Sequence, residues 1–272
     1  HGGGMNIQSN NILGKKSSLT LINSIFSDNT AEDYGGAMSI NLGNHSIINC
    51  TLINNYARYN GGISYNPPSG YHKSTLVLTN SILWVNKDSE GMDESAQIYN
   101  FIYDCWKPVV NYCCIQGLTG KLGGISNIGI NPLFVDTSND YHLQINSPCI
   151  DAGNNSAVPP SLLTDLDGKL RIMNGIIDMG VYETLNTYNV DTINGDDNNN
   201  GLNRETAFAT IQRGINLANN SFTVLVWPGT YQEKINFLGK AITVKSADYP
   251  SILEAPNNFA VSFYHHEDAN SI

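Results

Sequence analysis

Residues 21–29 read LINSIFSDN, and variants of this phrase return twice: residues 47–55 read IINCTLINN and residues 78–86 read LTNSILWVN. A second phrase runs in phase with the first, as GGGM at residues 2–5, GGAM at 35–38 and GGIS at 61–64. Self-similarity at such a period is typical of solenoids, in which each coil buries its apolar face on the next. The repeat therefore predicts stacked coils.

The coils are predicted to consist of β-strands. Apolar residues recur at every second position, as at Leu19 and Leu21 and at Leu76 and Leu78, which is the spacing of a strand. No repeat carries a helical stripe of useful length. Parallel strands stacked without intervening helices predict an all-β chain, and specifically a parallel β-helix.

Asparagine recurs at two positions of the repeat. One set is Asn23, Asn49 and Asn80, and the other is Asn29, Asn55 and Asn86. Stacked turns place one amide above the next, so that amides can bond along the stack, and Asn tolerates the left-handed conformation of tight corners. The Gly-Gly pairs suit corners at which a Cβ would clash. We expect structural asparagine ladders here and not a ligand site.

Five further motifs follow the coils in order. They are NPLFVD at residues 131–136, DYHL at 140–143, SPCIDAG at 147–153, TDLDG at 164–168 and IDMGVYE at 177–183. Together with the coils, they resemble the right-handed parallel β-helix proteins of the pectate-lyase-like superfamily, especially secreted bacterial proteins whose closing segment is often labelled a choice-of-anchor domain. The resemblance implies that residues 131–183 close a β-helix and that the protein is secreted or displayed on the cell surface. It defines no activity.

A second module is predicted after this segment. Phe208, Ile211 and Ile215 lie on one helical face after Thr206, a candidate N-cap, and the motif PGTYQE follows at residues 228–233. The order of helix, strand and PGTYxE resembles the cap and first coil of pectate-lyase-like and pectin-esterase-like β-helices. We expect a first β-helix ending in residues 1–185, an acidic linker loop in 186–206, and a capping helix with the first coils of a second, truncated β-helix in 207–272.

Composition excludes some partners. The net charge is −10 and charged residues are 14% of the chain, below the usual share of ~25%. The few arginines form no basic stripe, which argues against nucleic acid as a partner. No apolar stretch is long enough for a transmembrane helix. Both ends interrupt a module, so we expect a fragment of a longer polypeptide, which self-associates through open coil edges at residues 1–10 and 255–272.

The cysteines do not indicate a zinc site. They are Cys50, Cys105, Cys113, Cys114 and Cys149. The adjacent pair does not match the CxxC spacing of zinc ligands. Cys50 takes the strand position of Ser24 and Ser81, which predicts a small buried thiol. A bridge from Cys105 to Cys113 or Cys114 remains open.

Catalytic residues are sparse in the coils. Arg58 is the only arginine before residue 130, and it is the one candidate for the base of a calcium-assisted lyase. No carboxylates recur at repeat intervals around it, and no paired Asp suits glycoside hydrolysis. His142 lies within the closing motif, where a structural role is expected. His265 and His266 are adjacent, so in a strand they face opposite sides.

Calcium is the one cofactor that we considered. Asp191, Asn194, Asp196, Asp197 and Asn198 supply closely spaced oxygen ligands, which calcium favours. Asp165 and Asp167 form a shorter cluster of the same kind. The alternative is that both stretches are Asx-rich turns that need no metal.

Aromatic residues suggest a sugar platform. They are Tyr56, Tyr59, Tyr65, Tyr71 and Trp84, and exposed rings stack well on sugars, although the same rings could pack within the stack. We expect a non-catalytic scaffold that contacts a polysaccharide or cell-surface glycan. The alternatives are a lyase or esterase whose site lies mostly outside this stretch, and a structural surface protein that binds another protein.

Overall fold

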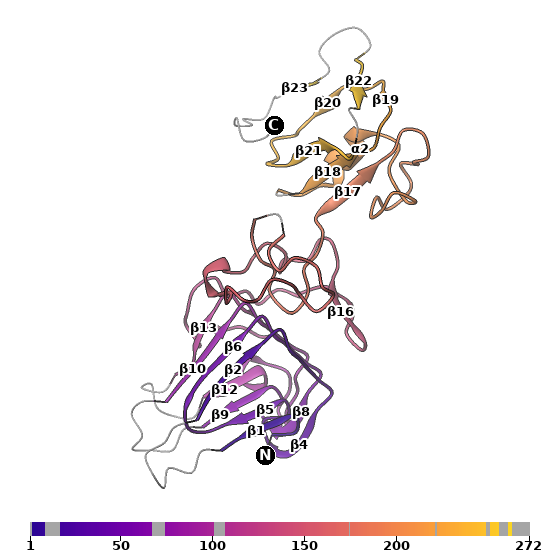
Figure 1. Ribbon diagram of the computed structural model, residues 1–272. Coiled ribbons are helices and arrows are strands. Elements are labelled where there is room, and N and C mark those ends of the chain that lie inside the picture. The colour runs from indigo at the N-terminus through magenta and orange to yellow at the C-terminus, as the bar shows by residue number, and fades with distance from the viewer. Residues whose placement is uncertain are drawn as a thin grey trace. The chain divides into compact units, whose positions relative to one another are not determined.

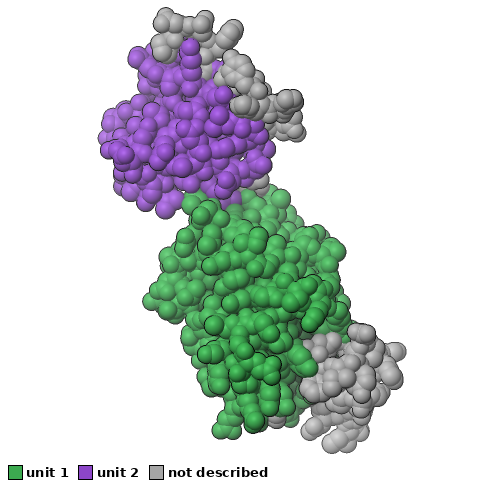
Figure 2. Space-filling view, turned by 180° about the vertical axis from the view of Figure 1, so that it is seen from behind, with its two compact units in different colours: residues 1–184 green, residues 185–272 purple. Residues whose placement is uncertain are grey.

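The computed structural model describes residues 2–8, 17–66, 74–100, 107–173, 175–220, 222–248, 251–255 and 261–262. The chain divides into two compact units, His1–Thr184 and Leu185–Ile272, which Figure 2 colours separately. Each unit is described by itself. Within the described ranges, no helix has the length and apolar character that crossing a membrane requires.

The first unit is a stack of parallel strands arranged in three four-stranded sheets (Figure 1). One sheet contains β1 (Met5–Ile7), β5 (Met38–Ile40), β9 (Ile63–Tyr65) and β12 (Ile98–Asn100). The second contains β2 (Ser18–Ile22), β6 (Asn44–Ile48), β10 (Thr75–Thr79) and β13 (Val109–Asn111). The third contains β3 (Ile25–Ser27), β7 (Thr51–Ile53), β11 (Ile82–Trp84) and β14 (Cys114–Ile115). A parallel pair, β4 (Thr30–Tyr34) and β8 (Tyr56–Tyr59), completes the coils.

The strand register follows the sequence repeat. Leu21 pairs with Ile47, Ile47 with Leu78, and Leu78 with Val110, so equivalent residues of successive coils lie side by side. Their side chains join one buried apolar core. The prediction of an all-β chain of stacked parallel strands is confirmed at this level.

The first corner of each coil is left-handed at asparagine. The φ angles of Asn23, Asn49 and Asn80 are 46°, 52° and 52°, and the same corner of the last coil uses Tyr112, with φ of 53°. The residue that follows turns inward and donates to the carbonyl two residues before it. These bonds run from Ser24 to Ile22, Cys50 to Ile48, Ser81 to Thr79, and Cys113 to Asn111.

The second corner places asparagine after a left-handed residue. Asp28, Asn54 and Val85 have φ of 57°, 57° and 55°, and the amides that follow them bond along the stack. Asn29 Nδ2 donates to Asn55 Oδ1 at 2.8 Å, Asn55 Nδ2 to Asn86 Oδ1 at 2.8 Å, and Asn86 Nδ2 to Gln97 Oε1 at 2.9 Å. Gln97 closes the short helix α1 (Glu94–Gln97).

The Gly-Gly corners allow coils to approach closely. A Cβ at Gly36 would lie 2.4 Å from Gly61 O and 2.6 Å from Tyr56 O. Gly35 has φ of 66°, a conformation that residues with a Cβ rarely adopt. Larger residues would therefore separate adjacent coils at this corner.

Residues 131–184 lie along the outer face of the third sheet. They include the antiparallel hairpin of β15 (Phe134–Asp136) and β16 (Asp140–Leu143) and the 3-10 helix η3 (Asn155–Ala157). Phe134, Leu143 and Met179 pack on Ile82 and Cys114, whose side chains face away from the interior core. We call residues 131–184 the closing segment. It buries a second face of the sheet, which explains why the strands of this sheet are apolar on both faces.

The first row of asparagines holds the closing segment. Asn23 Nδ2 donates to Thr164 O at 2.9 Å, and Asn80 Nδ2 donates to Asn154 O at 3.1 Å. Asn154 N donates back to Asn80 Oδ1 at 2.7 Å. Asn49 Nδ2 lies 3.5 Å from Asp178 O. The expectation of an amide ladder differs here from the structure, because these side chains bond to the closing segment and not to one another.

The second unit also contains parallel strands. Its sheets are β17–β18–β21, β19–β22 and β20–β23. Their bounds are β17 (Thr187–Val190), β18 (Thr223–Val226), β19 (Thr230–Tyr231), β20 (Ile235–Asn236), β21 (Thr243–Ser246), β22 (Ile252–Leu253) and β23 (Val261–Ser262). The division of this region into linker, cap and coils stays a prediction.

The helix of the second unit starts later than expected. Helix α2 spans Ile211–Leu217, and its N-cap is Thr210, whose hydroxyl accepts from Arg213 N. Thr206 is not the cap, because its hydroxyl donates to Asn203 Oδ1. Phe208 is buried but lies before the helix, in a bridge with Val190.

Candidate functional site

The outer surface of β4 and β8 carries a cluster of tyrosines. Ala31 and Ala57 pair with each other and point into the stack, while Tyr34 pairs with Tyr59 after a bulge. Tyr56 and Tyr59 are 43% and 37% exposed. Alternation directs Tyr56 outward beside the inward Ala57, and the register is irregular before Tyr59, which breaks the alternation there. We call Tyr34, Tyr56, Arg58 and Tyr59 the tyrosine face.

The rings of the tyrosine face are partly organised by one another. Tyr34 and Tyr59 stack with centroids 5.0 Å apart and an interplanar angle of 24°. The guanidinium of Arg58 lies 5.3 Å from the centroid of Tyr59. These contacts restrict the rings before a ligand arrives, but they also use part of the Tyr59 ring surface. The freest ring is that of Tyr56.

The exposed aromatic residues in the structure differ from those of the predicted platform. Tyr65 is 1% exposed and lies in the interior core, so it cannot stack on a polymer. Trp84 packs with the buried cluster beneath the closing segment. Tyr71 lies outside the described residues. Sequence reasoning missed Tyr34, although Tyr34 and Tyr59 both stand one or two positions before a Gly-Gly corner, which was a usable signal.

Arg58 is the residue that the sequence suggested as the base of a lyase. No ion pair recorded within the described ranges includes Arg58. Within the same ranges, no three His, Cys, Asp or Glu side chains form a group that could hold a metal ion. The bulge opposite Arg58 contains the carboxylates of Glu32 and Asp33, and a role of Arg58 as the base of a calcium-assisted lyase stays a prediction.

The acidic loop after β17 is built from Asx turns. Asp191 accepts from Ile193 N at 3.0 Å and from Arg204 Nε at 3.1 Å. Burial opposes ionisation of Asp191, but its hydrogen bonds outweigh burial and hold its pKa below the ordinary value. Asn194 Nδ2 donates to Asp191 Oδ2 at 3.3 Å, so these two side chains bond to each other within the turn.

The remaining residues of that loop also bond to nitrogen and hydroxyl donors. Asp196 Oδ1 accepts from the backbone N and from Nδ2 of Asn198, both at 2.9 Å. Asp197 accepts from Ala209 N at 2.9 Å and from the Thr210 hydroxyl at 2.8 Å. The five predicted calcium ligands therefore bond to donors in the turns and at the start of α2, and a calcium site in this loop stays a prediction.

The two carboxylates of the shorter acidic cluster, Asp165 and Asp167, make different bonds. Asp165 is buried and accepts from Lys169 N at 2.9 Å and from Glu183 N at 2.8 Å. Asp167 points instead to His142 and to Lys169, at 2.8 Å and 3.0 Å. Asp165 thus bonds to backbone N–H groups and Asp167 to the side chains of His142 and Lys169, and a calcium site here stays a prediction.

His142 forms a surface cluster that the sequence analysis did not foresee. Its Nδ1 lies 2.5 Å from Asp140 Oδ1 and its Nε2 2.8 Å from Asp167 Oδ2. Its ring stacks on Tyr182 with centroids 3.9 Å apart. Burial lowers the pKa of His142, but the bonds to the two carboxylates outweigh it and raise the pKa. A ring that donates from both nitrogens is protonated, which is the state that the two carboxylates favour. We call His142, Asp140 and Asp167 the clasp.

A buried acidic pair lies deeper in the closing segment. The side chains of Asp178 and Glu183 are sealed from solvent, and burial raises the pKa of both. Arg171 Nη1 lies 3.4 Å from Glu183 Oε1. Asp178 accepts from Asp151 N and Thr184 N, at 2.8 Å and 2.7 Å. These groups fix the path of the backbone, and their burial leaves no route to a substrate.

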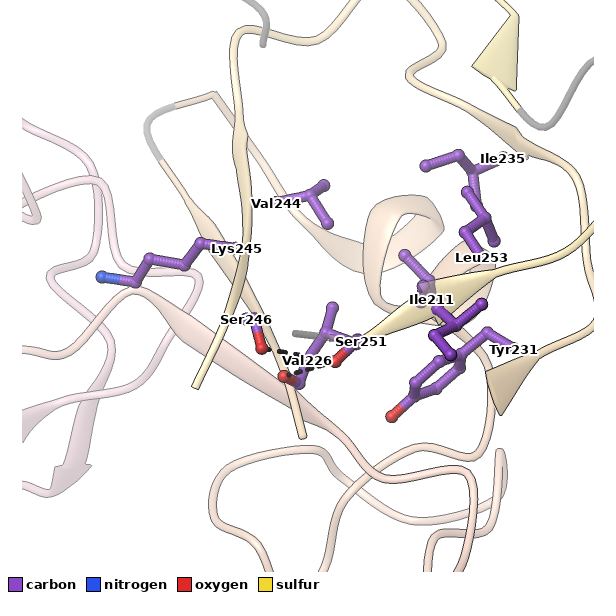
Figure 3. Close-up of a pocket in the computed structure, with 10 residues that line it drawn as sticks. Ile211, Val226, Tyr231, Ile235, Val244, Lys245, Ser246, Ser251 and Leu253 are labelled. Atoms are coloured by element: carbon purple, nitrogen blue, oxygen red, sulfur yellow. Dashed lines mark hydrogen bonds between the residues drawn. The ribbon is translucent and has the colours of Figure 1, made fainter. Parts of the chain in front are cut away.

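The second unit contains a pocket of about 170 Å³ between its sheets and α2. Figure 3 shows aliphatic side chains such as Ile211, Val244 and Leu253 around it, while Lys245 points away from them. Ser251 donates to Val226 O at 3.4 Å. The lining is mostly aliphatic, and its one charged residue, Lys245, is directed away from the cavity.

Comparison with protein-family models, with curated proteins and with solved structures finds no significant match to this chain.

Proposed function

We propose that the first unit is part of a right-handed parallel β-helix that serves as a non-catalytic, secreted or cell-surface scaffold and contacts a glycan through its tyrosine face. The observation that carries the proposal is the clustering of Tyr34, Tyr56, Arg58 and Tyr59 on one exposed strand pair. Ring faces and a guanidinium on a rigid sheet provide stacking and hydrogen bonds to sugar hydroxyls. The stacked parallel strands supply the rigidity.

An uncharged polysaccharide suits this surface better than a uronate polymer. Arg58 lies opposite the bulge that contains Glu32 and Asp33, which are exposed. The whole chain carries a net charge of −10. A polyanion approaching the tyrosine face would meet repulsion from these carboxylates.

The experiment is a binding assay against neutral and uronate polysaccharides, by affinity electrophoresis and calorimetry. We expect Tyr56→Ala and Tyr59→Ala each to weaken binding of a neutral glycan by about fivefold, since a ring contact contributes on the order of 1 kcal/mol. Leu163→Ala is the matched control, because Leu163 is 70% exposed and belongs to the closing segment.

The outcomes separate the alternatives. Loss of binding in the tyrosine variants, with Leu163→Ala unaffected, supports the proposal. Absence of binding to every glycan would reject it and favour a protein partner. A calcium-dependent rise in absorbance at about 235 nm on uronates would indicate β-elimination, and the chain would then be an enzyme through residues that the described structure does not bring together.

A further inference from the structure

All four cysteines that the described residues contain are buried thiols. Cys113 and Cys114 are adjacent in the chain, and adjacent residues of a strand face opposite sides of a sheet. Cys113 points into the interior core, which also contains Cys50. Cys114 faces the other way, into the apolar cluster beneath the closing segment, and Cys149 of that segment belongs to the same cluster.

Cys114 and Cys149 lie in the same apolar cluster, and contact with the Cys149 thiol, together with burial, raises the pKa of Cys114. Cys114 Sγ also lies 3.3 Å from Ile130 O. Both backbones are held in place around the contact between the two thiols. Cys114 N donates to Ser81 O at 2.9 Å. Cys149 N donates to the Ser147 hydroxyl at 3.1 Å, and Met179 N donates to Cys149 O at 2.9 Å. The contact therefore joins two ordered segments that are distant in sequence.

The other two thiols are engaged elsewhere. Cys50 Sγ lies 3.2 Å from Ile48 O, and Cys113 Sγ lies 3.3 Å from Asn111 O. Serine makes the same bond at the equivalent position of other coils, as Ser81 does to Thr79 O. A thiol at this position thus replaces a hydroxyl that bonds locally. Among the described cysteines, Cys114 and Cys149 are the two that share one cluster from segments distant in sequence.

We propose that Cys114 and Cys149 form a disulfide bond that fastens the closing segment to the last coil when the chain folds in the presence of a disulfide oxidant. The thiolate of one cysteine attacks a low-molecular-weight disulfide, forms a mixed disulfide and releases one thiolate. The second cysteine then attacks the protein sulfur of that mixed disulfide and releases the other thiolate. Two protein thiols are oxidised, one oxidant disulfide is reduced to two thiols, and the protons pass to solvent.

The bond must form before the closing segment docks completely. Contact with the Cys149 thiol and burial raise the pKa of Cys114, and a protonated thiol is a poor nucleophile. Both sulfurs are also closed to solvent in the folded state. The same burial protects the disulfide from reduction once it has formed. The bond would stabilise the fold chiefly by restricting the unfolded chain between residues 114 and 149.

The test is refolding with a mixture of oxidised and reduced glutathione, followed by non-reducing peptide mapping by mass spectrometry. We expect a peptide pair linked through Cys114 and Cys149. The melting temperature of the oxidised protein should exceed that of protein refolded in dithiothreitol by roughly 5–10 °C. Native reduced protein should react with a thiol reagent at Cys114 and Cys149 only after unfolding.

Two variants make the test specific. Cys113→Ser is the matched control, because serine already occupies the equivalent corner of two other coils, and it should retain both the linked peptide and the thermal shift. Cys149→Ala should lose both. A linkage from Cys105 or Cys113, or free thiols throughout after oxidative refolding of the unmodified chain, would overturn the proposal even if a variant failed to fold.

Discussion

The two asparagine rows of the coils have the same residue and the same spacing, but they perform different tasks. Asn29, Asn55 and Asn86 bond to one another along the stack. The row of Asn23, Asn49 and Asn80 bonds sideways to the closing segment. The backbone makes the difference. Asparagines of the first corner are themselves left-handed and direct their side chains outward, while those of the second follow a left-handed residue and point inward.

The comparison shows that a repeated residue need not form a ladder. Inside the stack, an amide bonds to the amide of the next coil and to backbone carbonyls such as Phe26 O and Ile53 O. Outside it, the partner is whatever chain covers the sheet, and here the backbone of the closing segment supplies carbonyls. A corner residue therefore serves internal cohesion or docking according to the side of the sheet that it faces.

The variant with the largest expected effect on the inner asparagine row is Asn55→Leu. The substitution leaves the N and Nδ2 of Asn29 without an acceptor, and it leaves Phe26 O and Ile53 O without the Asn55 donor. Each buried group left unpaired costs about 1–3 kcal/mol. We expect the free energy of unfolding of the first unit to fall by about 3 kcal/mol or more, as measured by urea denaturation.

The control is the neighbour of Asn55 on the outer side. Asn54→Gly preserves the left-handed backbone, for which φ is 57°, and removes a hydrogen bond to Thr137 O. Its effect should stay near about 1 kcal/mol. Equal destabilisation by the two variants would contradict the distinction between inner and outer amides.

A second test compares Asn80→Gly with Asn80→Ala. Glycine keeps the left-handed corner but loses both bonds to Asn154, which measure 2.7 Å and 3.1 Å, at a cost of about 1–2 kcal/mol. Alanine adds backbone strain of roughly 1 kcal/mol. Hydrogen exchange should accelerate in residues 150–180 for both variants.

The inner coils should respond much less to these two variants. Exchange in β6 and β7 should remain close to that of the unmodified chain, because their bonds do not involve the closing segment. Uniform acceleration throughout the first unit would show instead that Asn80 supports the stack itself, as the inner row does.

The smallest expected effect concerns pH. The pKa of His142 is raised above its ordinary value of 6.5, so its contribution to stability is complete below about pH 6.5 and is lost as pH rises through the folded-state pKa. The bonds to His142 lower the pKa of Asp140 and, with those of Lys169, the pKa of Asp167. Their contribution is present above the ordinary value of 3.8 and is lost as pH falls.

The clasp of His142 with Asp140 and Asp167 should therefore stabilise the fold most between the ordinary pKa values of 3.8 and 6.5. It is partly exposed, so its contribution is less than about 1 kcal/mol. Exchange of residues 164–170 should accelerate on the alkaline side of the window, and His142→Gln should flatten this response. A pH response that survives in the His142→Gln protein would assign it to other groups, such as the buried Asp178 and Glu183.

The tyrosine face shows which exposed rings a local sequence pattern can predict and which it cannot. Tyr56 and Tyr59 were identifiable because they lie in a polar stretch before a Gly-Gly corner. Tyr65 and Trp84 were not separable from them, because burial of a ring depends on which segment covers it. Trp84 is covered by residues of the closing segment that come more than forty positions later in the chain.

The acidic loops illustrate a second limit. Closely spaced Asp and Asn are equally compatible with a calcium site and with a series of Asx turns. The carboxylate of Asp197 accepts hydrogen bonds from the backbone N–H groups of Ala209 and Thr210, which lie beyond the loop. These hydrogen bonds depend on the tertiary fold, and no local sequence pattern predicts them.

The sequence by itself determined the strand period, the parallel register of the coils and the left-handed asparagine corners, because each depends on residues that recur at fixed spacing or on the conformational preference of one residue. Only the tertiary structure decided which asparagines bond along the stack, which rings stay exposed, where α2 begins and which cysteine meets Cys149. Each of these depends on a neighbour that is distant in sequence, and the neighbour's position is set by packing rather than by local pattern.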